Sequence, residues 1–360
     1  MNPFIYLRGL RYAAHTVFGV TSENKKTFQK FYTDPQFRRD LAYSSGQQVK
    51  RSILEALNLP FAAITFNWVI EKKENQAKQK EPHSPCDPTF ADQLLGGYMK
   101  AESGNFTVKR RSPLSISAMR PLHPLLGGVE FQKENLSFDR TSHPEHHIVN
   151  VYWVDEEKKR GTKLTDEELN EWLTTNNRNL PNRAFIQDQT RASGLFVYDV
   201  AIDLRTLFCV STNKLEPELF PEIEQKMRDA GWIDGANVFG RCLVCPEEKR
   251  KQIIPALANA LINWRITSNQ ARTFSLMETI AIAISEDANQ IAYAIRGELR
   301  DDTERPQASP RIDEQAKADI FVTPVASSFI TGAIGSVDAI DKAKLKLVEL
   351  MQAFDYENQV

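Results

Sequence analysis

The sequence contains few cysteines and no long apolar stretch. Its 360 residues include four cysteines, which are Cys86, Cys209, Cys242 and Cys245. So few thiols in a chain of this length do not fit the disulfide framework of a small secreted protein. No stretch approaches the roughly 18 consecutive apolar residues of a membrane-spanning helix, and the first residues lack the basic-then-apolar pattern of a signal peptide. We therefore expect a cytoplasmic protein that has no membrane partner.

The chain also lacks an excess of charge of either sign. It has 45 Lys and Arg against 47 Asp and Glu, for a net charge of −2. A protein that binds nucleic acid on its own usually has a clear basic excess, but a local cluster of cations along a groove is sufficient. The charges are segregated: residues 155–171 are rich in acids, whereas residues 100–120 hold five basic residues and a single acid, Glu102.

Sequence motifs of several enzyme classes are absent. The chain has no Gly-rich phosphate loop, dinucleotide-binding fingerprint, Ser-His-Asp signature or H-E-x-x-H zinc motif. A metabolic enzyme would therefore need a small-molecule pocket that no motif reveals.

Two groups of possible metal ligands are present. Cys242-Leu-Val-Cys245 could complete a zinc site with Cys86 and Cys209, but the apolar residues around it favour buried structural thiols. His143, His146 and His147 lie beside Glu145 without the spacing of a closed site. We predict no metal and no cofactor.

Hydrophobic periodicity predicts an α+β protein. Strands are expected over residues 4–20, 61–71, 106–119, 147–154, 194–207 and 274–285, and helices over 46–58, 89–99, 165–173, 216–231, 247–266 and 337–354. Residues 72–88 have the composition of a loop or an insertion. Residues 120–192 form an excursion that is too long for a structureless loop and indicates a functional projection or a subdomain.

Residues 43–54 carry the most chemical information. Ser44 or Ser45 is placed to cap a helix, and the apolar residues that follow recur every four positions, as on a buried helix face. Lys50 and Arg51 then point toward solvent. Free N–H groups at a helix start, with hydroxyls and two cations close behind, suit a phosphate group. An ordinary amphipathic helix with a solvated basic side has the same pattern.

Five segments follow one another in a particular order. They are Ser44-Ser-Gly-Gln-Gln-Val-Lys-Arg51, Asp92-Gln-Leu-Leu-Gly-Gly-Tyr-Met99, Arg110-Arg-Ser-Pro-Leu-Ser-Ile-Ser117, Ser193-Gly-Leu-Phe-Val-Tyr-Asp-Val-Ala-Ile-Asp-Leu204 and Ser268-Asn-Gln-Ala-Arg272. Together they resemble the motifs of the CRISPR-associated Cascade backbone family. This family belongs to the RAMP superfamily and supplies the guide-binding subunit of type I CRISPR systems.

The resemblance implies a fold and a division of the chain. The fold is a modified RNA-recognition-motif, or ferredoxin-like, core with an inserted thumb hairpin or subdomain and a helical flank. Residues 1–120 and 193–335 would form the palm core, residues 121–192 the thumb, and residues 336–360 a C-terminal helix.

The resemblance also implies a function without catalysis. The chain would bind CRISPR RNA, polymerise head to tail with copies of itself, join other Cascade subunits and present the guide for pairing with target DNA. An alternative is an RNA-cleaving endoribonuclease of the same superfamily. Asp34 and Asp40 lie in the loop where such relatives carry a catalytic Asp, and we interpret both as ordinary loop residues.

Candidate RNA-binding residues follow from the matched motifs and the first strand. They are Arg11, Ser45, Gln47, Lys50, Arg51, Arg110, Arg111, Asn269, Gln270 and Arg272. A thumb of this family flips one nucleotide out of the duplex, for which an apolar wedge beside cations is suited. The candidates for that role are Arg183, Phe185, Ile186 and Arg191.

Overall fold

The structure is a computed structural model of the whole chain. It describes residues 2–23, 26–71, 76–102, 106–132, 136–139, 148–154, 161–178, 180, 183–186, 189–266, 274–300, 302 and 304–360. Among the helices in these ranges, none combines the length and the apolar character needed to cross a membrane.

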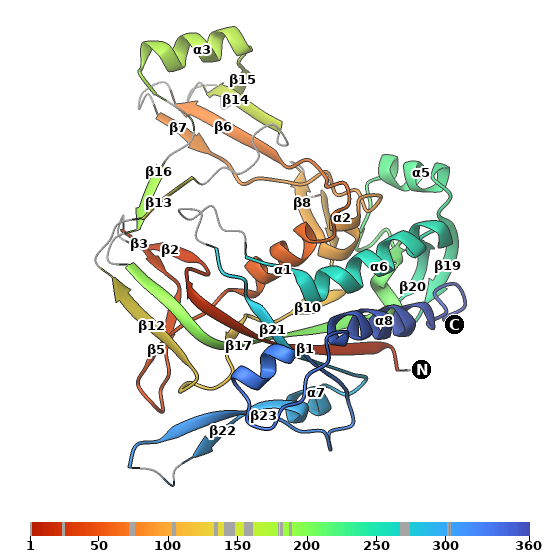
Figure 1. Cartoon of the computed structure of the whole chain (residues 1–360). Helices are drawn as coiled ribbons and strands as arrows, with labels where there is room; N and C mark the ends of the chain where they lie inside the picture. Colours follow the sequence, from red (N-terminus) through yellow and green to blue (C-terminus); the bar gives the residue numbers. More distant parts are fainter. Residues whose placement is uncertain are drawn as a thin grey trace.

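A seven-stranded antiparallel sheet forms the centre of the molecule (Figure 1). Its strands lie in the order β10 (Leu114–Ile116), β17 (Gln189–Asp203), β1 (Phe4–Thr16), β21 (Glu278–Ser285) and β24 (Asp319–Val322), and β11 (Arg120–Pro121) and β12 (Gly127–Gln132) also pair with β17. Helix α1 (Gly46–Glu55) connects β1 to the β10 side, and α6 (Glu247–Asn263) connects β17 to β21. This is the βαββαβ arrangement of a ferredoxin-like fold, so the predicted α+β class and its RRM-like core are confirmed.

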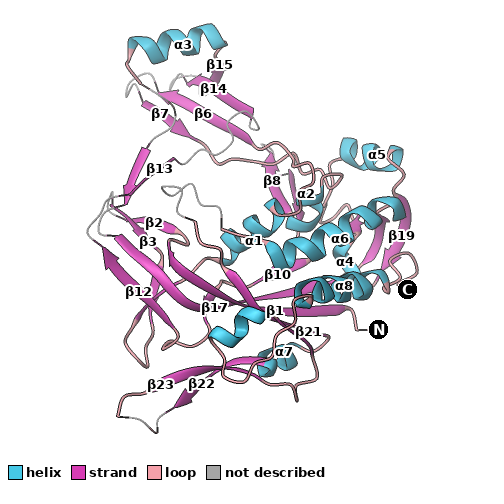
Figure 2. Cartoon of the chain, in the orientation of Figure 1, coloured by secondary structure: helices cyan, strands magenta, loops and turns pink. Residues whose placement is uncertain are grey.

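The two faces of the sheet are covered differently. Alternate residues of β1 point to opposite faces, so that Ile5 and Leu7 join the large core beneath α1, α6 and α8 (Ala339–Gln352), whereas Leu10 joins a second core. Short helix α7 (Ala288–Ala294), the 3-10 turn η2 (Pro324–Ser328) and the ribbon of β22 (Ile295–Arg300) and β23 (Gln307–Ile312) lie on that second side (Figure 2). They leave part of the β17 and β10 edge uncovered.

A separate small subdomain lies above the sheet in Figure 1. Strand β14 (Ile148–Val154) pairs in parallel with β6 (Thr65–Glu71), and β7 (Gln76–Gln79) and β15 (Gly161–Lys163) complete the sheet. Helix α3 (Asp166–Thr175) packs on it through buried Trp172. The prediction for 72–88, a loop or an insertion, did not include a strand: β7 forms by pairing with β6, which no local pattern encodes.

The predicted thumb also recruits a segment from elsewhere in the chain. β12 continues the pairing along β17, β13 (Leu136–Asp139) pairs with β16 (Arg183–Ile186), and β16 lies beside the hairpin of β2 (Val20–Glu23) and β3 (Lys26–Gln29). Residues 21–42 are polar, with Lys, Asp and Pro interspersed, and predict irregular structure where that hairpin forms. Residues 121–192 are thus divided between two parts: the strands β12, β13 and β16, and the subdomain of β14, β15 and α3. The first part pairs with β3, and the second pairs with β6, so both need strands from the first 80 residues.

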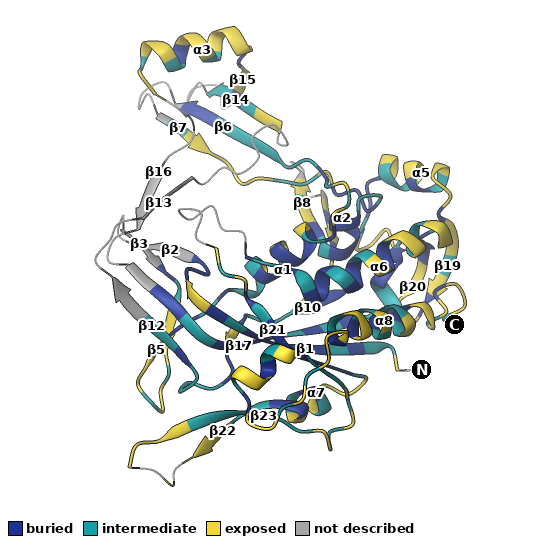
Figure 3. Ribbon diagram, in the orientation of Figure 1, coloured by how far each residue is buried: buried dark blue, intermediate teal, exposed yellow. Residues whose placement is uncertain are grey.

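The remaining elements surround the helical face of the sheet. They are β4 (Phe31–Thr33), β5 (Asp40–Ala42), α2 (Ala91–Gly96), β8 (Tyr98–Glu102), β9 (Phe106–Arg110), α4 (Leu204–Leu207), β18 (Cys209–Ser211), α5 (Pro221–Asp229), β19 (Ile233–Asn237) and β20 (Gly240–Val244). Buried residues concentrate between α1, α6 and the sheet, and α3 presents mostly exposed residues (Figure 3).

Candidate nucleic-acid interface

The first turn of α1 is fixed from both sides. The Ser45 side chain caps the helix by accepting a hydrogen bond from the Gln48 backbone N–H at 3.4 Å. The Gln48 side chain is held by the Ser44 hydroxyl at 3.0 Å and donates to the Phe18 carbonyl at the end of β1. The N–H groups of the first helical residues have no intrahelical partner, so this turn presents donors and a positive dipole end in a rigid position.

One face of α1 lies against residues 116–118 at its start and against α2 at its end. A Cβ on Gly46 would come within 2.7 Å of the Ile116 carbonyl oxygen, and a Cβ on Gly96 would come within 2.9 Å of the Leu54 side chain. Gly96 ends α2, which leads into the backbone beside Arg111. Residues four apart share a helix face, so Lys50 lies between Gly46 and Leu54 along this line of contact.

Lys50 is a half-buried cation. Within the described part of the chain its ammonium group has no carboxylate partner and no hydrogen-bond acceptor. Burial lowers the pKa of Lys50 from 10.5 to about 8. A partly desolvated ammonium without a counter-charge is a favourable position for an anion, because a bound phosphate would restore the interactions that burial removes.

Arg111 adds a second cation, beside Gly97 at the end of α2. Arg111 and Lys109 are exposed, and neither side chain has an ion-pair partner among the described residues. Gln47 is exposed at the other end, in the first turn of α1. Arg51 is less available, because its Nε donates to Glu55 at 2.6 Å and its guanidinium lies over the Phe61 ring at 5.1 Å.

The glycines of the second motif place Arg111. Gly97 has a φ of +71°, and a Cβ there would lie 2.6 Å from the Arg110 carbonyl oxygen. Only glycine fits such a position without strain. The backbone can therefore turn from α2 into β8 directly against residues 110–112.

Arg11 is a core residue, which corrects its predicted contact with RNA. It is fully buried, and its guanidinium donates to the carbonyls of Ile262 and Trp264 at the C-terminal end of α6. The same group lies 4.3 Å from the Trp264 ring centroid and 5.0 Å from that of Tyr198. Burial lowers its pKa to about 10. Arg11 thus satisfies helix-end carbonyls and the negative end of the helix dipole.

Arg110 is also structural, so the prediction for it is wrong in the same way. Its side chain is buried and donates to the Glu218 carboxylate at 2.9 Å. Its other hydrogen bonds go to the carbonyls of Leu94, Thr206 and Cys209, at 2.9 to 3.1 Å. Strand alternation separates it from Lys109 and Arg111, which face outward.

Comparison with known proteins gives no family assignment. No family model and no curated protein matches the sequence. Two similar solved chains are named "CRISPR RNA-guided surveillance complex" and "CRISPR RNA-guided surveillance complex, pre-nicking". Each is 10% identical over 97% of this chain, covering 84% and 88% of the other chain, with TM-scores of 0.34 and 0.36. At this identity and these TM-scores, neither likeness assigns a function.

The remaining candidates are described only in part. Asn269, Gln270 and Arg272 lie outside the described residues, as do His143, His146 and His147. The backbone of Arg183, Phe185 and Ile186 lies in β16. Arg191 is buried on β17 where it pairs with β12, and its Nε and Nη1 atoms have no hydrogen-bond partner in the described part of the chain.

The other possible sites of the sequence have local structural roles. The Asp34 carboxylate accepts the backbone N–H groups of Gln36 and Phe37, and Asp40 accepts from the Thr33 hydroxyl at 2.7 Å. Both acids therefore stabilise the β4–β5 hairpin.

The cysteines lie in the core. All four are buried and free, and the Cys209 sulfur accepts a hydrogen bond from the Gln359 side chain at 3.1 Å. In the described ranges, no three His, Cys, Asp or Glu side chains are grouped to hold a metal ion.

Two features of this site have no sequence signal. Lys30 is half-buried without a described side-chain partner, and its backbone bonds to Gly19 and Tyr43 place it beside the residues that cap α1. The role of Gln48 as the anchor of the first turn depends on Phe18, 30 residues earlier in the chain.

Proposed function

We propose that this chain is a non-catalytic RNA-binding subunit of a CRISPR surveillance complex, and that it holds the guide along α1 and residues 111–117. The supporting observation is that two cations from separate motifs have no described counter-charge: Lys50 is on α1, and Arg111 is beside the end of α2, which packs on α1. The rigid first turn of α1 adds backbone donors for a phosphate. Contacts of this kind bind the RNA backbone and leave the bases available for pairing with target DNA.

The subunit would polymerise head to tail along its guide and join other Cascade subunits. Heterologous contacts of this type build an open filament. Helix α3 supports this proposal with an exposed acidic first turn, Asp166, Glu167 and Glu168, which could meet the basic surface of the next copy. Replacing Glu167 and Glu168 by Lys should shorten the assemblies seen by light scattering with RNA present, and unchanged assembly would refute this acidic contact.

Co-purified nucleic acid tests the proposal most directly. The full chain, expressed with a CRISPR array, should retain RNA of repeat-spacer sequence, which sequencing identifies. The double variant Lys50→Gln/Arg111→Gln should retain much less, whereas Arg241→Gln, at an exposed arginine of β20, should behave like the unchanged protein. Random cellular RNA in the unchanged protein would contradict the proposal.

A cleavage assay separates this function from that of an endoribonuclease. Guide and complementary RNA with magnesium should stay intact in the presence of the protein. Regular cuts that disappear in Asp34→Ala or Asp40→Ala would show the enzymatic alternative instead.

A further inference from the structure

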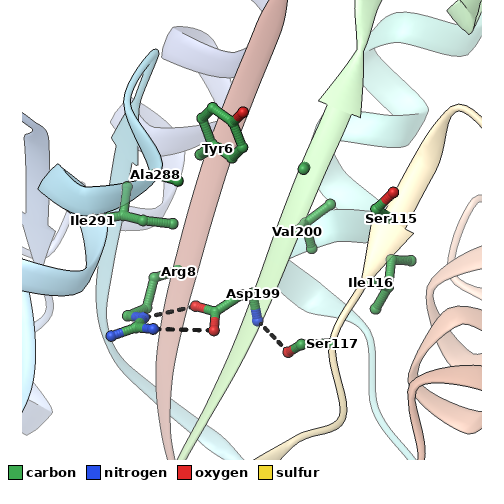
Figure 4. Close-up of a pocket in the computed structure, with 10 residues that line it drawn as sticks. Tyr6, Arg8, Ser115, Ile116, Ser117, Asp199, Val200, Ala288 and Ile291 are labelled. Atoms are coloured by element: carbon green, nitrogen blue, oxygen red, sulfur yellow. Dashed lines mark hydrogen bonds and ion pairs between the residues drawn. The ribbon is translucent and has the colours of Figure 1, made fainter.

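An open cavity of about 440 Å³ lies on the face of the central sheet opposite α1 (Figure 4). Tyr6 and Ile291 form one wall, and Ser115 forms the other. The cavity exists because small side chains surround the Tyr6 ring: Ala201 is its partner on β17, and Ser115 is the partner of Ala201 on β10.

The charged groups at one end of the cavity neutralise each other. Arg8 donates to both oxygens of Asp199, at 2.6 and 3.0 Å, and its third nitrogen donates to the Ile295 carbonyl. Arg120 adds a more distant contact to Asp199 at 3.9 Å. A free anion would meet the Asp199 carboxylate here, and a free cation would meet two guanidinium groups, so the site favours an uncharged ligand.

Uncharged polar groups in the cavity remain available. The hydroxyls of Tyr6 and Ser115 have no hydrogen-bond partner among the described residues, and each can donate as well as accept. Together with the tyrosine ring and the apolar wall, they suit a flat, neutral ligand that has donors and acceptors on its edge. Nucleobases have this chemistry.

Beyond Tyr6, further aromatic rings and a guanidinium group form a row of stacking surfaces. The Tyr6 and Phe4 rings are stacked at 6.0 Å between centroids. The Arg205 guanidinium lies 4.8 Å from the Phe4 centroid and 4.9 Å from that of Phe239. Asp203 holds Arg205 in place with bonds of 2.9 and 3.0 Å, and Phe239 is 62% exposed. Rings alternating with a fixed guanidinium plane are the type of surface on which successive bases of a single strand stack.

We infer that this face binds a single-stranded nucleic acid, with one base inserted in the cavity against Tyr6 and its neighbours stacked along Phe4, Arg205 and Phe239. The exposed guanidinium of Arg120 lies at the Asp199 end of the cavity, and because Arg8 already neutralises Asp199, Arg120 is placed to contact a phosphate of the same strand. The sheet separates this site from Lys50, because α1 packs on the opposite face. The site is therefore independent of the proposed guide surface.

Photo-cross-linking of the full chain tests the site. The probes are 12-nucleotide oligonucleotides, one of RNA and one of DNA, each with a single 5-iodouracil base that reacts with a stacked aromatic ring. Mass spectrometry should find the cross-link at Tyr6 or Phe4. Tyr6→Leu, and Ser115→Leu, which fills the cavity, should each weaken binding about tenfold, as expected for the loss of one stacked base. Tyr293→Leu, at an α7 tyrosine that is 56% exposed and does not line the cavity, is the matched control and should change nothing.

The outcomes distinguish this site from the guide surface. Lys50→Gln should leave the Tyr6 cross-link unchanged, and the better of the two probes identifies the type of strand. Circular dichroism checks that each variant is folded, and Ser115→Leu keeps the test valid if Tyr6→Leu does not fold. Cross-links confined to other residues, unaltered binding by a folded Ser115→Leu, or loss of the Tyr6 cross-link in Lys50→Gln would overturn the inference.

Discussion

Arg110 and Arg111 are consecutive residues with opposite environments: the first side chain is 3% exposed, and the second is exposed to solvent. Arg110 joins α2, α4, β18 and Glu218 through four hydrogen bonds, whereas Arg111 has no described partner. One position therefore serves the fold, and the next is free to contact RNA.

The pair predicts a separation of stability from binding. Arg110→Ala should lower the free energy of unfolding by about 3 kcal/mol, because Glu218 and three carbonyls lose a buried donor. Arg111→Ala should change the free energy of unfolding by less than about 0.5 kcal/mol. It should also reduce the slope of log affinity against log salt concentration by about 1, the amount expected for the loss of one phosphate contact. Urea denaturation and binding at several salt concentrations measure the two effects. Equal loss of binding per folded molecule in both variants would contradict this separation.

Lys50 predicts a dependence of RNA affinity on pH. Its pKa of about 8 means that the ammonium group loses its proton as the pH rises through this value, so affinity should fall between pH 7 and 9. Lys50→Arg should remove the dependence, because the guanidinium stays charged. Lys50→Gln should bind weakly at every pH, and a pH profile like that of the unchanged protein in either variant would exclude Lys50 as the cause.

The stability of the RNA-free protein should change in the opposite direction. The folded pKa of Lys50 lies below the unfolded value of 10.5, so between pH 8 and 10.5 the unfolded chain holds a proton that the folded chain has lost. The Lys50 contribution to the free energy of unfolding therefore rises with pH in this window. The difference between the unchanged protein and Lys50→Gln, followed by urea denaturation, isolates that contribution.

Arg11 is expected to act on stability alone. Arg11→Ala leaves the Ile262 carbonyl at the end of α6 without this donor, whereas the Trp264 carbonyl keeps that of Arg265. It also opens a cavity beside Trp264 and Tyr198, and the two effects together should cost about 3 kcal/mol. Thermal unfolding followed by circular dichroism measures the loss. If the Arg11→Ala protein is stable but binds RNA more weakly, Arg11 contributes to RNA binding and this prediction is wrong.

Gly97 predicts a backbone requirement in the second motif. Gly97→Ala places a Cβ 2.6 Å from the Arg110 carbonyl at a φ of +71°, so the backbone must shift. We expect a loss of about 1–3 kcal/mol in the free energy of unfolding, together with weaker RNA binding as Arg111 moves. Gly332→Ala is a matched control, since its φ is +76° but no atom lies within 4 Å of the added Cβ. A smaller effect at Gly97 than at Gly332 would show that the close backbone contact is unimportant.

Local pattern was sufficient for the elements that carry their own signals. The prediction of α1 rests on a cap at Ser44 or Ser45 and on apolar spacing; the structure confirms the spacing and assigns the cap to Ser45. The capping box of α3 begins at Thr165 as predicted, and the nearly unbroken apolar run of β17 forms a central buried strand. These features depend on residues a few positions apart, whose interactions the sequence order already fixes.

The sequence by itself determined the α+β class, the capped helix at residue 46 and the positions of the cations. The tertiary structure decided which cations are available to bind RNA, because burial depends on contacts between distant segments. Arg11 donates to carbonyls at the end of α6, and Arg110 pairs with Glu218. Lys50 and Arg111 remain without a described counter-charge. It also decided that β7 and the β2–β3 hairpin are strands, since their pairing partners lie far along the chain. The sequence gives the type of each charged residue, but the burial and the charge partners of that residue are set only when the chain folds.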